Sequence, residues 1–240
     1  MSRPARLRLG AARARHREAH RHDRGRQDTA RGASAVTRAP DASAAGWQLA
    51  AASADDTWRR IADALDTAAR SSRHPFHLLT VASVAADGAP HARTVVLRRF
   101  DAIRREVWFH TDARSPKVAQ LTHDARVALH WYSATDRLQL RIAARATLHH
   151  RDEVARAAWM AAEPMSRACY TTPVAPGTVL AGFPVAPTAP LADDDGGLAS
   201  FVAVRCRFTD VEVLSLHATG HERVVLRLDG PAATRDILAP

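Results

Sequence analysis

Residues 77–100 read HLLTVASVAADGAPHARTVVLRRF, and this stretch decides the fold. Two runs rich in apolar and β-branched residues, 77–84 and 91–100, flank the dipeptide Asp87-Gly88. An Asp-Gly dipeptide between two such runs is typical of a tight β-hairpin turn. The stretch therefore predicts two antiparallel strands at the start of a sheet.

The rest of the chain continues this pattern. Further short strands are expected over 106–111, 126–132, 138–148, 200–208, 211–216 and 222–229. Apolar periodicity predicts helices over 55–70, 115–122 and 151–162, the last with Val154, Ala158 and Met160 turned inward. The Pro- and Gly-rich residues 163–199 are expected to form a long loop. Many short strands with few helices predict one α+β domain, an antiparallel barrel, over residues 46–240.

Composition excludes several classes of protein. The chain has 240 residues, of which 46% are hydrophobic, enough for a domain with an apolar core. No apolar run approaches the roughly 18 residues that a membrane-spanning helix needs, so we expect no membrane protein. The two cysteines, Cys169 and Cys206, are too few for a disulfide framework, and we expect both to be buried structural thiols. A reducing compartment, the cytoplasm, is expected.

The net charge of +9 is concentrated at the start of the chain. Residues 1–45 hold eleven arginines and four acids, a charge of +7, and the remaining chain carries only +2. Such a block usually stays disordered and contacts anions without specificity. It also lacks the apolar segment of a secretory signal. We therefore expect a disordered basic tail over 1–45 and no nucleic-acid binding beyond non-specific contacts.

The most informative local motif is the stretch from Thr111 to Lys117, TDARSPK. Pro116 suits the first position of a helix, which makes Ser115 its N-cap. The free N–H groups of a helix N-terminus favour an anion, and Lys117 adds a positive charge beside them. Lys117 is the only lysine among 34 basic residues. The stretch predicts a phosphate cradle; the alternative is an ordinary capped surface helix with a stray lysine.

Two other strands carry polar residues in suggestive positions. Arg93 and Arg98 bracket an apolar run and, being five positions apart, point to opposite faces of a regular strand. Either the strand bulges between them or the two arginines meet different parts of a ligand or of a subunit interface, and bracketing surface arginines are the simpler alternative. Gln139 shares a strand face with Arg137 and Arg141, where its amide can address a heterocycle if that face lines a cleft.

Some residue patterns are discounted as sites. His217 and His221 have a metal-ligand spacing only on a helix, and their surroundings predict strand and turn, so no metal site is expected. A Gly-rich dinucleotide fingerprint and a phosphate-binding Walker loop are both missing from the sequence.

Taken in order, these segments resemble the pyridoxamine 5′-phosphate oxidase-related family of FMN-binding split-barrel proteins. The resemblance covers roughly residues 76–240, with gaps across the long loop. It rests on the stretches RTVVLR (93–98), HT (110–111) and SPKVAQL (115–121), on Trp131-Tyr132, on Gln139, and on His221-Glu222-Arg223 with the terminal Leu238-Ala239-Pro240.

The resemblance implies an FMN cofactor held between the two subunits of a homodimer. The FMN ligands that it implies are Arg93, Thr94, Val95, Val96, Leu97, Arg98, His110, Thr111, Ser115, Lys117, Gln139 and Arg223. His221 is expected to contact the substrate, and no catalytic residue is assigned.

The resemblance is weaker for the substrate than for the cofactor. The Arg-x-His pair with which the true oxidase binds pyridoxamine phosphate reads Thr219-Gly220-His221 here, and Glu163 stands where the family has a second phosphate-binding arginine. The resemblance implies an FMN-dependent oxidoreductase that oxidises a small, amine-bearing or other reduced substrate through flavin N5. The alternatives are a non-catalytic flavin- or haem-binding protein of the same fold and a nucleic-acid accessory protein that uses the tail.

Overall fold

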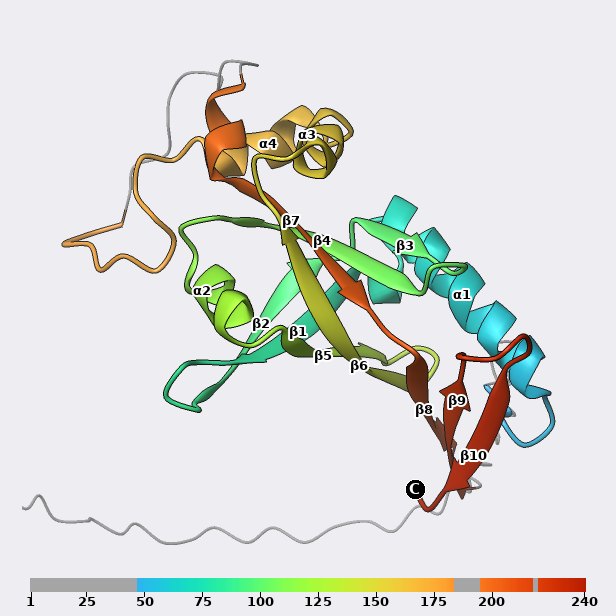
Figure 1. Cartoon of the computed structure of the whole chain (residues 1–240). Coiled ribbons are helices and arrows are strands. Elements are labelled where there is room, and N and C mark those ends of the chain that lie inside the picture. The colour runs from blue at the N-terminus through green and yellow to red at the C-terminus, as the bar shows by residue number, and fades with distance from the viewer. Residues whose placement is uncertain (1–46, 184–194, 218–219) are drawn as a thin grey trace, which may run out of the picture. The chain divides into compact units, whose positions relative to one another are not determined.

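The computed structural model of the chain describes residues 47–183, 195–217 and 220–240 (Figure 1). The strands are β1 (Leu78–Val84), β2 (Pro90–Val96), β3 (Arg99–Asp101), β4 (Glu106–Asp112), β5 (Arg126–Ser133), β6 (Leu138–His149), β7 (Phe201–Arg207), β8 (Asp210–His217), β9 (Gly220–Arg227) and β10 (Thr234–Leu238). The α-helices are α1 (Ala54–Arg70), α2 (Pro116–His123), α3 (Glu153–Met160) and α4 (Pro164–Arg167). Short 3-10 helices are η2 (Pro75–His77), η3 (Ala168–Tyr170) and η4 (Asp195–Ser200).

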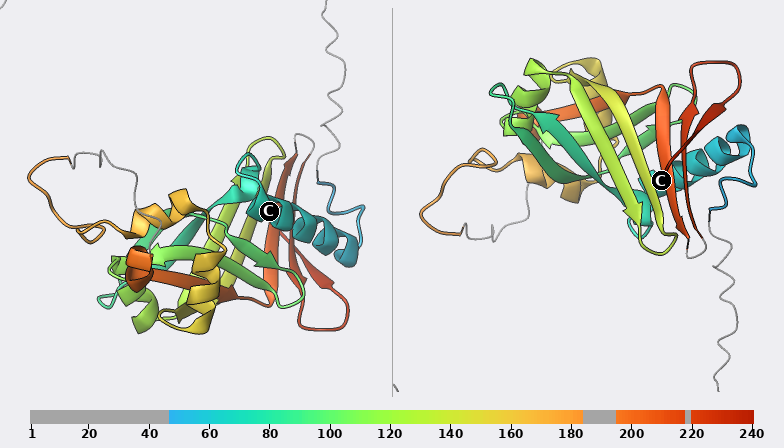
Figure 2. Two further views of the ribbon diagram at one scale, coloured as in Figure 1. Left: turned by 90° about the horizontal axis from the view of Figure 1, so that it is seen from above. Right: turned by 90° about the horizontal axis from the view of Figure 1, so that it is seen from below.

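All strand pairs that the structure describes are antiparallel, and they join into one curled sheet (Figure 2). One path runs in the order β10-β9-β8-β6-β5-β1-β2, and a branch runs from β6 through β7 and β4 to β3. The branch point is the long strand β6, whose residues 138–141 pair with β8 and whose residues 145–149 pair with β7. The sheet therefore splits along β6 into a barrel and a three-strand wing, β8–β10.

The barrel closes on an apolar core because the inward positions of its strands alternate with polar outward ones. In β5 the inward residues Val127, Leu129 and Trp131 are buried, while the residues between them are not. Such alternation is what a half-buried strand requires. A second, smaller cluster around Trp108, Trp159 and Phe201 lies where β4 and β7 meet α3.

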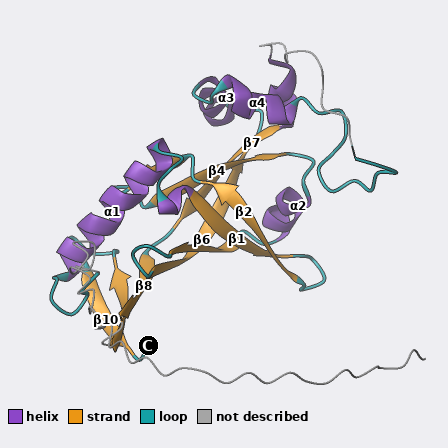
Figure 3. Ribbon diagram, turned by 180° about the vertical axis from the view of Figure 1, so that it is seen from behind, coloured by secondary structure: helices purple, strands orange, loops and turns teal. Residues whose placement is uncertain are grey.

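Helix α1 flanks the barrel beside β3 and the wing (Figure 3). It begins at Ser53, whose hydroxyl accepts a hydrogen bond from the Asp56 N–H and so caps the first turn. Its inward residues Ile61, Leu65 and Ala68 are fully buried. None of the described helices is both long and apolar enough to cross a membrane.

The expected fold class is confirmed: the sheet is an antiparallel split barrel with a few flanking helices. The expected strand 91–100 is two strands, because the chain leaves the sheet at Leu97 and Arg98 before β3 begins. Strand β10 was not expected, and the expected loop 163–199 contains α4, η3 and η4 as well as residues outside the described part. The tail over 1–45 also lies outside the described residues.

Two expectations about burial are wrong in part. On α3 the buried residues are Ala155 and Trp159, whereas Val154 and Met160 are 39% and 66% exposed. The bulky indole of Trp159 decides the orientation, since it packs against Phe201 at a centroid distance of 5.3 Å. Cys206 is buried in the barrel core, which raises the pKa of its thiol to about 12, but Cys169 is exposed.

Candidate functional site

The expected cradle forms at the start of α2. Pro116 occupies the first turn and Ser115 is the N-cap in extended conformation, as the sequence predicts. Ser115 makes no side-chain cap to the helix, so its hydroxyl is free for another partner. Both Ser115 and Thr111 are buried, 5% exposed each. The helix start therefore presents two buried hydroxyls to one side chain.

That side chain is Lys117. Its Nζ donates to Thr111 Oγ1 at 2.9 Å and to Ser115 Oγ at 2.8 Å. Burial, together with the nearby charge of Arg93, lowers the pKa of Lys117, and Asp112 opposes this shift. The ammonium is thus held in place by neutral oxygens beside a second cation.

Arg93 is positioned by two residues to which the sequence analysis assigned no role. Its guanidinium donates to Ser83 Oγ at 2.6 Å and to Gln120 Oε1 at 2.7 Å. Ser83 also donates to Gln120 Oε1, at 2.7 Å. Both partners are buried, and a serine at an inward position of an otherwise apolar strand was the one signal available in the sequence.

We call Arg93, Thr111, Ser115 and Lys117 the α2 cradle. Among the described residues neither of its cations forms an ion pair, and the hydrogen-bond partners of both are uncharged. The nearest acid, Asp112, is already bound by Arg114. Burial alone raises the pKa of Asp112, but hydrogen bonds from Arg114 bring it below its usual value. Two cations without a carboxylate partner favour a bound anion.

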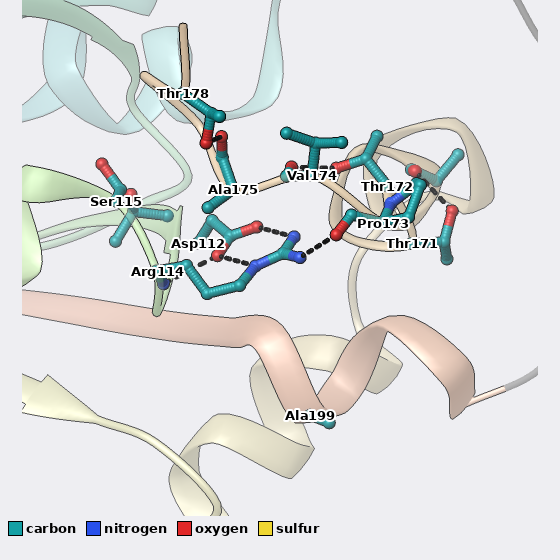
Figure 4. Close-up of polar contacts among 12 residues, drawn as sticks. Asp112, Arg114, Ser115, Thr171, Thr172, Pro173, Val174, Ala175, Thr178 and Ala199 are labelled. Atoms are coloured by element: carbon teal, nitrogen blue, oxygen red, sulfur yellow. Dashed lines mark hydrogen bonds and ion pairs between the residues drawn. The ribbon is translucent and has the colours of Figure 1, made fainter. Parts of the chain in front are cut away.

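The loop in front of α2 is tied to the segment 171–178 (Figure 4). Arg114 donates from Nε and Nη2 to the two carboxylate oxygens of Asp112, at 2.9 and 2.7 Å, and from Nη1 to the Pro173 carbonyl at 3.3 Å. The Ala113 N–H also donates to the Ser200 carbonyl at 2.7 Å. These contacts fix the approach of the chain to the cradle from two segments distant in sequence.

Arg98 does not join the α2 cradle. The chain leaves the sheet between β2, which ends at Val96, and β3, which begins at Arg99, so Arg93 and Arg98 do not belong to one regular strand. Arg98 lines a cavity of about 960 Å³, which we call the α3 pocket. Trp108 and His110 of β4 also line it, as do Glu153, Ala158 and Glu163 of the α3 region.

His110 is kept neutral in this pocket. Burial, with the positive charge of Arg98 beside it, lowers the pKa of His110 to about 4. Its ring packs edge-on against Phe201 at 4.7 Å between centroids. At neutral pH the His110 imidazole is therefore uncharged and able to donate or accept a hydrogen bond.

Gln139 and Arg223 lie in one row that runs from β6 across the wing. Gln139 of β6 is opposite Leu214 of β8, and Leu214 is opposite Arg223 of β9, so the three side chains share a sheet face. Arg223 pairs with Glu212 at 2.8 Å. His221 lies two residues before Arg223 on the same face and is exposed. No contact within the described residues joins this row to the α2 cradle or the α3 pocket.

The remaining expected ligands lie along β2. Thr94 is exposed, and Val95 and Val96 are half-buried. Leu97 is fully buried in the core, and its N–H donates to the His77 carbonyl at 2.8 Å. The Leu97 side chain packs in the core and its N–H is hydrogen-bonded within the protein, so the carbonyl is the Leu97 group that can face a ligand.

Known proteins share both sequence and fold with this chain. Residues 55–150 match the family model described as the pyridoxamine 5′-phosphate oxidase, FMN-binding domain. A pyridoxine/pyridoxamine 5′-phosphate oxidase of Caulobacter vibrioides is 34% identical over 91 residues, which cover 37% of this chain and 40% of that protein. The chain therefore matches less than half the length of this curated relative.

Solved structures extend the likeness beyond residues 55–150. A pyridoxamine 5′-phosphate oxidase-related, FMN-binding protein of Nostoc punctiforme has a TM-score of 0.60 and 26% identity, over 76% of this chain and 97% of that one. PhzG of Burkholderia lata, solved with tetrahydrophenazine-1-carboxylic acid, has a TM-score of 0.55 and 21% identity, over 77% and 90%. Residues 55–150 thus match the FMN-binding domain of pyridoxamine 5′-phosphate oxidases, and the described chain has the fold of a related FMN-binding protein, a likeness that the sequence motifs indicated.

Proposed function

We propose that the protein binds FMN through the α2 cradle and acts as an FMN-dependent oxidoreductase on a small substrate. The observation that carries the proposal is the pair of cations, Lys117 and Arg93, held by neutral partners at the start of α2. The match to the FMN-binding domain over residues 55–150 includes every residue of the cradle.

The residues present fit the phosphate end of FMN. A phosphate monoester is close to a dianion at neutral pH, and the two half-buried cations match that charge. The hydroxyls of Thr111 and Ser115 accept hydrogen bonds from Lys117, and each can donate a hydrogen bond to a phosphate oxygen. The helix N-terminus adds a favourable field of the same sign.

When bound, FMN supplies a hydride acceptor at its N5 atom, and the protein supplies placement and exclusion of water. Lys117 and Arg93 would bind its phosphate, and the hydrogen bonds to Gln120 and Ser83 hold the Arg93 guanidinium in place. Arg98 and neutral His110 line the α3 pocket, where a substrate can be oriented. Oxidation of vitamin B6 phosphates is not part of the proposal, because Glu163 places a negative charge in this pocket.

We further propose that the protein is a homodimer and that the wing of the partner subunit completes the FMN site. Within one chain the row Gln139–Leu214–Arg223 is separate from the cradle, so these expected ligands can contact the same FMN only from another copy. Tyr132, next to Gln139 in the sheet and 48% exposed, extends the row as a surface to be covered. Sedimentation of the purified protein tests this: a monomer with full FMN affinity contradicts it.

The first experiment is an absorption spectrum of the purified protein, followed by mass identification of the released cofactor. Flavin bands with released FMN are the expected result. A colourless protein that does not take up added FMN contradicts the proposal. A haem spectrum supports the alternative of a non-catalytic cofactor-binding protein, as does bound FMN that no small reduced donor can reduce.

A further inference from the structure

The α3 pocket lies outside the α2 cradle, and its charges lack partners. Arg98 is the clearest case, because its Nε is buried and has no hydrogen-bond partner in the described part of the chain. The other two arginines of the lining are already used: Arg70 pairs with Asp66 at 2.5 Å, and Arg99 with Asp101 at 3.3 Å. One guanidinium is therefore available to a ligand.

Two acidic side chains also line the pocket. Glu153 is the first residue of α3 and Glu163 is the N-cap of α4, so both stand at helix starts. Neither carboxylate forms an ion pair or a side-chain hydrogen bond within residues 47–183, 195–217 and 220–240. Both line the same cavity as Arg98. The pocket thus offers one free positive group and two free negative groups.

Part of the remaining lining is apolar. Ala157 and Ala158 of α3, Ala161 just after this helix and Trp108 of β4 line the pocket. His110 adds no charge at neutral pH. Small methyl groups and an indole leave room for a short hydrocarbon body beside the charged groups.

We propose that the α3 pocket selects a small unbranched substrate with an acidic group bound by Arg98 and an ammonium group bound by Glu153 and Glu163. That the ligand is a substrate rests on the proposed flavin function, but its binding to the pocket does not require FMN. A ligand that carries only a phosphate dianion is disfavoured, since it meets two carboxylates for one guanidinium. Glu153 and Glu163 are therefore the residues that determine specificity.

A series of ligands with similar chain length tests the charge pattern. Lysine carries two ammonium groups and one carboxylate, 6-aminohexanoate one of each, cadaverine two ammonium groups, and hexanoate only a carboxylate. Calorimetry is carried out with FMN-loaded protein and with protein freed of FMN. We expect lysine and 6-aminohexanoate to bind most tightly and hexanoate most weakly.

Charge-neutral variants assign the effect to residues. Glu153→Gln and Glu163→Gln should each weaken the binding of lysine on the order of three- to fivefold, as expected for solvent-exposed ion pairs. The double variant should bind hexanoate more tightly than the unchanged protein does, because the repulsion is gone. Asp229→Asn is the matched control: Asp229 is exposed, lies outside the pocket lining, and should leave every affinity unchanged.

The outcomes separate this inference from the proposed function. If the ligands bind in the expected order of affinity but the protein does not bind FMN, the result supports the proposed pocket specificity and contradicts the flavin proposal. Flavin-loaded protein that binds hexanoate as tightly as lysine, or binds no member at millimolar concentration, overturns the inference and leaves FMN binding intact. Equal effects of Asp229→Asn and Glu163→Gln also overturn it.

Discussion

The α2 cradle and the α3 pocket both present cations, but they differ in what surrounds them. Lys117 and Arg93 are held by hydroxyl and amide oxygens, and the nearest acid is occupied by Arg114. The buried Nε of Arg98 has no such support, and two carboxylates without an ion pair in the described part of the chain line the same pocket. Neutral support leaves the full positive charge available to one anion, whereas opposed charges select a ligand by how its own charges are spaced.

The two regions also differ in how far apart their parts lie in sequence. Three of the four cradle residues fall within 111–117, and a hairpin strand brings Arg93 to them. The α3 pocket combines α1, β3, β4 and α3, and only the closed barrel brings these together. A change in one region should therefore leave the other intact, which the following variants test.

Removal of the Lys117 ammonium should have the largest effect. Lys117→Ala deletes a charge-assisted contact to phosphate, and FMN affinity should fall about a hundredfold, or about 3 kcal/mol. Flavin fluorescence titration measures the change. Binding of lysine to the α3 pocket of the FMN-free variant should not change.

Lys117→Arg serves as the matched control for charge. A planar guanidinium cannot occupy the position between Thr111 and Ser115 that the compact ammonium holds, so only part of the affinity should return. Full affinity in Lys117→Ala, with an unchanged thermal unfolding profile, contradicts the cradle.

Acid should destabilise the protein through His110. The pKa of His110 in the folded protein is about 4, below its ordinary value of 6.5, so the unfolded chain binds more protons between these pH values. The free energy of unfolding therefore falls as pH drops through this window, by about 2–3 kcal/mol at pH 4.5 relative to pH 7.5. Urea unfolding at both pH values, compared between the unchanged protein and His110→Gln, isolates this contribution; equal pH dependence in the two contradicts it.

Gly197→Ala should damage the α3 side alone. A Cβ at Gly197 would lie 2.7 Å from the buried Trp159 ring, so the packing of η4 against α3 must shift. We expect a loss of about 2 kcal/mol in unfolding free energy, within the range for overpacked sites. The affinity of the α3 pocket for lysine should fall as well, while the affinity of each folded molecule for FMN stays the same. Gly182→Ala is the control, because nothing lies within 4 Å of its added Cβ.

Gln120→Leu should give the smallest effect and shows whether positioning matters in the cradle. It keeps the side-chain volume but removes the oxygen that accepts from Arg93 and Ser83. FMN affinity should fall about fivefold, near 1 kcal/mol, with Arg93 still present. Gln120→Glu should reduce FMN affinity further, since a carboxylate would neutralise Arg93. The reverse order contradicts the positioning role.

Much of the barrel could be predicted because its signals are local. The Asp87-Gly88 turn and the alternation in β5 specify strands through steric preference and burial, which neighbouring residues alone decide. Strand β10 could not be predicted: Thr234–Leu238 has no buried side of its own and forms by pairing with β9. The inward face of α3 was wrong for the same reason, since Trp159 finds its partner Phe201 more than forty residues away.

By itself, the sequence determined the split-barrel class and the start of α2, where Ser115, Pro116 and Lys117 act within one helical turn. Tertiary structure alone decided that Ser83 and Gln120 hold Arg93, and that Arg98 lines a separate pocket together with Glu153 and Glu163. The physical reason is range. Capping and strand alternation act between residues a few positions apart, whereas the charges that surround a binding site meet only after the chain has closed on its core.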